Sequence, residues 1–132
     1  MIMSLICEGD VILKIFDKMT LKEICNLVEG VVVCGEERLD DTVEYAFASD
    51  LMSDVLTIRK DHFLLITGLA NIQSIRTAEM SDVPYLLLCR NKEVTPEMRE
   101  LAEDDNILII KSKYSLFKCA GLLYSAGLKP VY

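Results

Sequence analysis

The residues best suited to bind a ligand stand directly after runs of apolar residues. They are Ser49-Asp50, Thr67-Gly68-Leu69-Ala70-Asn71, Cys89-Arg90-Asn91-Lys92 and Ser112-Lys113. Glycine before a helix lets backbone amides approach an anion, and basic side chains pair with phosphate or carboxylate. The candidate ligand-binding residues are therefore Asp50, Thr67, Gly68, Asn71, Arg90 and Asn91, with a small anion as ligand. The plainer alternative is a turn glycine needed only for geometry and exposed basic residues with no specific role.

The chain offers no recognisable catalytic set. It contains neither Gly-x-x-x-x-Gly-Lys-Ser/Thr nor Gly-x-Gly-x-x-Gly, so it lacks both standard phosphate cradles. Its single histidine, His62, stands before an apolar run, at the wrong end of a strand for a site. Cys89 is the best thiol nucleophile, but no second histidine exists to activate it. We expect no catalytic residues, and an enzyme using Cys89 or Asp50 is the weakest hypothesis.

Cysteines and acidic residues do not form a metal-ligand pattern. The five cysteines are widely spaced and include no Cys-x-x-Cys. The acidic residues occur as contiguous groups typical of solvated loops: Glu36-Glu37, Asp40-Asp41 and Glu103-Asp104-Asp105. We expect five free thiols, no metal and no cofactor.

Uninterrupted apolar runs give the fold class. Residues 63–66, 85–89 and 107–110 lack polar alternation, as strands buried on both faces of a parallel sheet do. Helix-like segments separate them, which gives β-α-β-α-β-α with right-handed crossovers. The sequence therefore predicts a single-domain α/β fold with a mostly parallel sheet flanked by helices. The strand exits, Thr67 and Arg90 among them, should share one edge of the sheet.

Local signals place the remaining elements. Thr20-Leu21-Lys22-Glu23 is a capping box that opens a helix ending near Gly30, and Thr95-Pro96-Glu97 opens another helix. Further segments are expected as strands at 31–34 and 43–48, a helical turn or two at 51–56, and helices at 69–80 and 114–126. The last of these helices is apolar around much of its circumference and should be buried on more than one side, either in the core or in a subunit contact. Residues 1–18 are separable as an added strand or arm, which leaves residues 19–132 as the domain.

Composition excludes several classes of protein. A net charge of −7 argues against a general nucleic-acid binder. No apolar run reaches the roughly 18 residues of a membrane helix, and the start does not resemble a signal peptide, so a cytoplasmic protein is expected. Residues 107–132 carry four lysines and no acid, which would suit an acidic partner or simply a solvated helix face.

Apolar surface at both ends of the chain predicts self-association. The last helix carries apolar residues around more than half of its turn, namely Leu116, Phe117, Leu122, Leu123 and Tyr124. The first sixteen residues add Ile2, Leu5, Ile6, Val11, Ile12, Leu13, Ile15 and Phe16. A two-fold homodimer would bury both surfaces. The alternative is that the first residues fold back over their own helix.

The order of motifs resembles the DRTGG domain family over about residues 19–126. The most specific matches are Ala-Ser-Asp-Leu-Met-Ser-Asp-Val-Leu, which ends at Leu56, and Thr-Pro-Glu-Met-Arg-Glu-Leu-Ala, which ends at Ala102. The same unit is similar to the amino-terminal domains of HPr serine kinase/phosphorylase and of Mur ligases. The chain departs from the family's naming motifs, since Leu69-Ala70-Asn71 follows Thr67-Gly68 and Cys89-Arg90-Asn91 stands in place of Thr-Gly-Gly.

The resemblance to the kinase covers only its non-catalytic domain, and it implies a regulatory or ligand-sensing module. Such a module would act through a partner protein or its own dimer. A protein-interaction adaptor without a small ligand is the alternative, and a small enzyme is the less favoured one.

Overall fold

Six strands form the sheet at the centre of the protein. The computed structural model describes residues 18–132. The strands lie side by side in the order β2 (Val31–Cys34), β7 (Leu108–Lys111), β6 (Tyr85–Leu88), β5 (Leu64–Thr67), β4 (Tyr45–Ala48) and β8 (Lys129–Pro130). All neighbours are parallel except β2, which runs antiparallel to β7. The predicted mostly parallel α/β sheet is confirmed.

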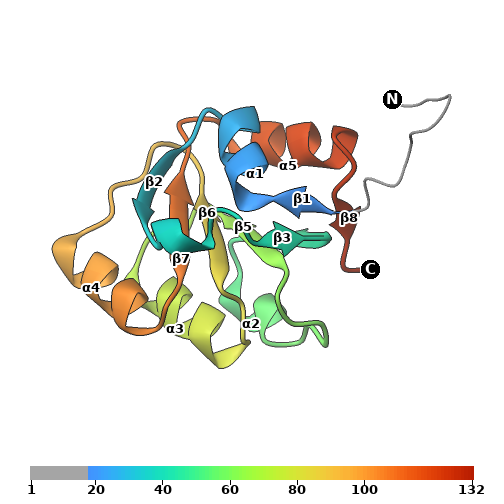
Figure 1. Ribbon diagram of the computed structural model, residues 1–132. Helices are drawn as coiled ribbons and strands as arrows, with labels where there is room; N and C mark the ends of the chain where they lie inside the picture. Colours follow the sequence, from blue (N-terminus) through green and yellow to red (C-terminus); the bar gives the residue numbers. More distant parts are fainter. Residues whose placement is uncertain (1–17) are drawn as a thin grey trace, which may run out of the picture.

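Helices cover both faces of this sheet (Figure 1). Helices α1 (Leu21–Leu27) and α5 (Leu116–Ser125) pack on one face, and α2 (Met52–Val55), α3 (Ile72–Met80) and α4 (Pro96–Asp104) pack on the other. Side chains alternate between the two cores, so that Leu64 faces α5 while Leu65 faces α3. All four residues of β5 and of β6 are buried. Burial on both faces explains why these strands carry no polar alternation.

Side-chain caps fix where the helices begin. Thr20 caps α1, and the full capping box is present: the Glu23 N–H donates to Thr20 Oγ1 at 3.1 Å, and the Thr20 N–H donates to Glu23 Oε1 at 2.9 Å. Asn71, Thr95 and Ser115 cap α3, α4 and α5 in the same manner. The capping signals at Thr20 and Thr95 are therefore confirmed. Helix α3 begins at Ile72, because Asn71 caps it, and not at Leu69.

The segment expected as one strand at 43–48 divides into two. Strand β3 (Thr42–Val43) pairs antiparallel with β1 (Met19–Thr20), whereas β4 joins the main sheet beside β5. The chain therefore leaves one sheet and enters the other at Glu44. The two-residue strand β8 was not anticipated, because Lys129-Pro130 carries no strand signal of its own. Proline is tolerated there because β8 is an edge strand.

The last helix buries a narrower surface than its composition suggested. Cys119 and Leu123 are buried, but the Phe117 and Tyr124 side chains are 89% and 69% exposed. Residues 18–132 therefore cover only one face of this helix, and its burial on a second side, in a subunit contact, stays a prediction. None of the described helices is long and apolar enough to cross a membrane.

A buried tyrosine ties the loop before β3 to the central sheet. The Tyr85 hydroxyl donates to Asp41 Oδ2 at 3.0 Å, and Arg38 Nη1 donates to the same oxygen at 3.1 Å. Arg38 Nε also donates to the Asn106 carbonyl at 2.7 Å. Burial and the hydrogen bond to Asp41 raise the pKa of Tyr85 to about 12.

We predict that Tyr85→Phe lowers stability at neutral pH by about 1 kcal/mol, since one hydrogen bond is lost. The folded pKa lies above the ordinary value near 10, so the folded state holds the phenolic proton more tightly than the unfolded state. Stability contributed by this group is complete below pH 10 and falls as the pH rises toward 12. Urea unfolding across this range should show a steeper alkaline loss in wild type than in Tyr85→Phe. The exposed Tyr124→Phe serves as the matched control, and equal slopes in all three proteins would contradict the assignment.

Candidate functional site

The Asp50 carboxylate joins the exits of three adjacent strands. Asp50 lies just after β4, and its Oδ1 accepts from the Gly68 N–H at 2.7 Å and from the Thr67 hydroxyl at 3.1 Å. Its Oδ2 accepts from Arg90 Nη2 at 3.4 Å. Thr67 ends β5, and Arg90 follows β6 by two residues. Parallel strands deliver their exits to one edge, so the prediction that Thr67 and Arg90 share an edge is confirmed.

The Arg90 guanidinium lies against the backbone of Gly68. Arg90 Nη2 donates to the Gly68 carbonyl at 3.2 Å, and the Arg90 side chain remains 49% exposed. A Cβ atom at position 68 would lie 2.6 Å from Arg90 Nε and 2.8 Å from Arg90 Cζ. Glycine at position 68 is therefore required for the close approach of a guanidinium.

This arrangement revises the role that the sequence suggested for Gly68. The backbone amide of Gly68 was expected to face an anionic ligand, but it donates to the carboxylate of Asp50. The carboxylate of Asp50 therefore occupies the position beside this amide that an anionic ligand was expected to take. The cationic group left facing solvent is the guanidinium of Arg90.

Left-handed backbone geometry directs the loop after β6. Arg90 and Asn91 have φ angles of 67° and 53°. The Arg90 N–H donates to the Tyr114 carbonyl at 2.8 Å, and the Asn91 N–H donates to the Ser112 carbonyl at 2.9 Å. These two bonds hold the exit loop of β6 against the exit of β7, which offsets the cost of the unusual conformation.

The remaining candidates have different surroundings. The Asn71 Oδ1 atom accepts from the Ser74 N–H at 2.9 Å, so this side chain caps α3. Asn91 and Lys92 follow Arg90 in the loop, with Asn91 exposed and Lys92 half-buried. The structure thus brings Asp50, Thr67, Gly68 and Arg90 into direct contact, with Asn91 beside them.

Two buried thiols lie beneath this edge. Cys89 and Cys119 are both fully buried and hydrogen-bonded to each other. This hydrogen bond and burial raise the pKa of Cys89, which donates, while the same bond lowers the pKa of Cys119, which accepts. Cys89 is therefore inaccessible to a substrate. Cys25 and Cys34 are also free thiols among the described residues, and Cys7 lies outside them.

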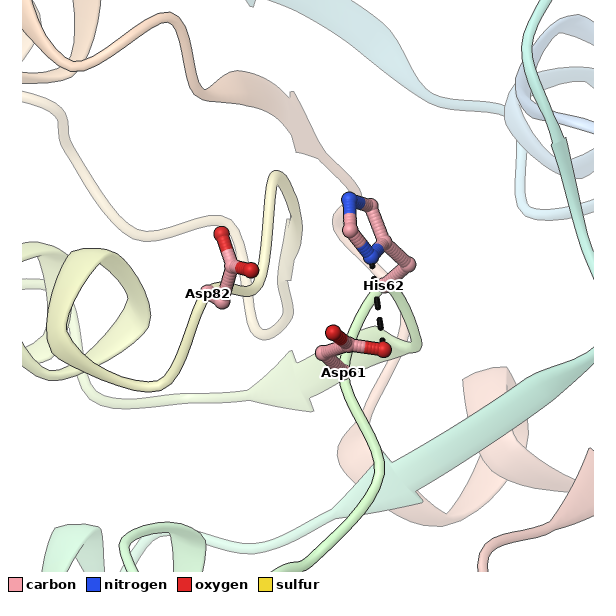
Figure 2. Close-up of side chains that lie close together, drawn as sticks. All are labelled: Asp61, His62 and Asp82. Carbon is pink, nitrogen blue, oxygen red and sulfur yellow. Dashed lines mark ion pairs between the residues drawn. The ribbon is translucent and has the colours of Figure 1, made fainter.

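A second polar group lies near the amino end of β5, far along the strand from Asp50. Asp61, His62 and Asp82 offer ligand atoms that all lie within 4.8 Å of one another (Figure 2). His62 Nδ1 lies 3.4 Å from Asp61 Oδ1, and all three residues are exposed. Asp82 joins the group because the His62 N–H donates to its carbonyl at 3.2 Å, a long-range pairing that sequence spacing did not reveal. Exposed acidic groups of this kind are common without an ion, so we assign it no metal.

Chemically, the edge of the sheet offers a cation beside a hydrogen-bond acceptor. An exposed guanidinium favours a phosphate or carboxylate group. The half-exposed carboxylate of Asp50 can accept from a hydroxyl or amine of the same ligand. The Thr67 hydroxyl lies beside the Asp50 carboxylate, but Thr67 is fully buried and its oxygen also accepts from the Leu69 N–H at 3.1 Å, so it does not face a substrate. The exposed groups of the arrangement suit binding.

We predict that Asp50→Ala destabilises the protein by about 1–3 kcal/mol, because the Gly68 amide and the buried Thr67 hydroxyl lose their acceptor. Asp50→Asn keeps an acceptor oxygen at the same place and should cost less. Chemical denaturation of the two variants checks the order. Wild-type stability in Asp50→Ala would show that the carboxylate does not organise this edge.

The comparisons with known proteins agree with this fold. The family model described as the DRTGG domain matches residues 23–126. Among solved structures, the chain is similar to the CBS and DRTGG domains of the regulatory region of a Clostridium perfringens pyrophosphatase, complexed with the activator diadenosine tetraphosphate. The TM-score is 0.65 at 18% identity, over 79% of this chain and 45% of that one. The chain thus spans less than half of that neighbour, and no curated protein matches it.

Proposed function

This chain belongs to the DRTGG domain family, and we propose that it is a non-catalytic regulatory module that senses a small anionic ligand. Its response would pass to a partner protein or to a second copy of the chain. The observation that carries the proposal is the exposed guanidinium of Arg90, held over Gly68 by Asp50. We place the module, as residues 19–132, in the cytoplasm and away from nucleic acid and membranes.

A nucleotide phosphate is the ligand class that we favour. The structurally similar regulatory region of the Clostridium perfringens pyrophosphatase is complexed with diadenosine tetraphosphate. This compound combines phosphates with ribose hydroxyls. Arg90 would pair with a phosphate, and Asp50 would accept from a hydroxyl. In this chain, Asn91 and Lys92 are positioned by the same loop to add further donors.

Ligand binding would change the contacts of Asp50. An anion paired with Arg90 competes with the 3.4 Å contact between Arg90 and Asp50. Weakening that contact would loosen the link between the loop after β6 and the segment from Asp50 to α2. This coupling would convert occupancy of the site into a movement that a partner protein can detect.

We predict that the full chain binds ATP and diadenosine tetraphosphate and does not bind adenosine, measured by isothermal titration and by thermal shift. A ligand at about 100 times its dissociation constant adds near 2.7 kcal/mol of stability. Arg90→Ala should weaken binding by about tenfold or more, since a charge-assisted contact of roughly 1.5–3 kcal/mol is lost. Gly68→Ala should also weaken it, because the new Cβ displaces the guanidinium.

Arg59→Ala is the matched control for charge, because Arg59 is exposed in the loop before β5, at the opposite edge of the sheet. It should bind like wild type. Equal affinities in Arg90→Ala and wild type, or binding of adenosine as tight as that of ATP, would exclude the anion site.

We further propose that the chain forms a homodimer at micromolar concentration, because several large apolar side chains of residues 18–132 are exposed to water. Phe117, Tyr124 and Tyr132 are the most exposed of these side chains near the carboxyl end. Sedimentation velocity of the full chain should give a concentration-dependent shift from monomer to dimer. A single monomeric species up to about 100 µM, where even weak self-association would register, would contradict the dimer.

A protein-interaction adaptor without a small ligand is the second candidate. The exposed face of α5 favours it, since Phe117 and Tyr124 present aromatic rings to solvent. In that case the titrations would show no binding of ATP or diadenosine tetraphosphate. The exposed apolar face of α5 would then be the functional surface.

A further inference from the structure

An apolar groove lies between α5, β4 and the end of the chain. Its volume is ≈ 390 Å³, and apolar atoms form most of its wall. Phe47 and Ala48 of β4 line one side, and Phe117, Gly121 and Tyr124 of α5 line the other. Val131 and Tyr132 close the end. The groove therefore gathers three of the most exposed large apolar side chains of residues 18–132, those of Phe117, Tyr124 and Tyr132.

The side of the groove formed by α5 has free space at Gly121. A Cβ atom built on this residue would meet no atom within 4 Å. Phe117, Gly121 and Tyr124 stand at helical spacing, so they form one stripe along the exposed side of α5. A stripe with glycine in the middle and aromatic residues at both ends can receive an apolar chain segment.

The described part of the chain begins beside this groove. Lys18 and Met19 line a surface depression together with Ala126, which directly follows α5. Leu128, two residues further on, already lines the groove. In Figure 1, strand β1 begins on the same side of the molecule as β8 and the carboxyl terminus. Residues 1–17 therefore join the domain within a few residues of the groove.

Their length and composition suit the groove. Seventeen extended residues reach at most roughly 55–60 Å, whereas the ten residues of α5 span about 15 Å. Residues 11–16 read Val-Ile-Leu-Lys-Ile-Phe, and residues 1–7 add a second apolar run. Between and after these runs lie Glu8, Asp10 and Asp17, while the carboxyl-terminal region around the groove carries lysines and no acid.

We propose that residues 1–16 of the same chain dock in this groove and cover the apolar stripe on α5. The amino-terminal extension would then be an intramolecular arm. This role is additional to the proposed ligand sensing. This docking is the alternative to the homodimer proposed above, because both would bury Phe117, Tyr124 and Tyr132. The alternatives of a second copy's arm and of a small apolar molecule are outcomes of the test below.

Amide hydrogen exchange of the full chain tests the arm directly, read from the peptide that covers residues 1–17. In wild type, its exchange should be slowed about tenfold or more relative to an unstructured peptide. Gly121→Glu and Phe117→Glu should abolish this protection, because each places a charged carboxylate in an apolar groove that the apolar runs of the arm would fill. Glutamate is a better helix former than glycine, so Gly121→Glu does not weaken α5 itself.

Met80→Glu is the matched control. Met80 is 69% exposed on α3, which packs on the other face of the sheet, and this variant should keep the protection of the arm. Unchanged exchange in β5, β6 and β7 confirms that every variant is folded.

Three results would overturn the proposal: an unprotected arm in wild type, equal protection in all variants, or protection that disappears on dilution together with a dimer. The last result would assign the arm to a second copy. An unprotected arm with a groove that binds a small apolar probe would assign the groove to a ligand. Binding of ATP at Arg90 is measured separately, so failure of the arm and failure of ligand sensing are distinguishable.

Discussion

The carboxylate of Asp50 is the interaction on which the carboxyl edge of the sheet depends. It is held by the Gly68 amide at 2.7 Å and by the Thr67 hydroxyl at 3.1 Å, and it positions the guanidinium of Arg90. Three loops that are distant in sequence are joined through this one side chain. Its negative charge is compensated by a fixed amide dipole and one cation, and its side chain is 45% exposed.

The same interaction would link the proposed ligand sensing to the fold. Arg90 lies in a loop whose left-handed residues are held by backbone bonds to the exit of β7. Its side chain, in contrast, is hydrogen-bonded within residues 18–132 to Asp50 and to the Gly68 carbonyl. The rigid part is thus the backbone and the adjustable part is the guanidinium. A regulatory module needs this combination, because a ligand shifts a population only through contacts that differ between two states.

The sequence predicted the fold well because its signals were local or periodic. Unbroken apolar runs indicated the buried parallel strands, and the capping residues Thr20 and Thr95 marked helix starts that the structure confirms. Strand order is a long-range property, so the adjacency of β4 and β5 was not predictable, although Asp50 and Gly68 were expected at the same edge as strand exits. The hydrogen bond from the His62 N–H to the Asp82 carbonyl also joins residues that are distant in the sequence, as does the pairing of β8 with β4. Neither contact was predictable, for the same reason. Composition marked α5 as apolar around much of its circumference, but it could not say which of its faces residues 18–132 cover.

The most direct test of the account is an amide chemical-shift titration of the full ¹⁵N-labelled chain with diadenosine tetraphosphate. The account predicts that the largest changes fall on the amides of Gly68, Arg90 and Asn91, since the ligand competes for the guanidinium that Asp50 holds. It also predicts that Asp50→Asn alters the starting shift of Gly68, whose amide donates to that side chain. Absence of any change at these residues, or changes centred on Gly121 and Tyr124 of α5, would contradict ligand sensing at the edge of the sheet.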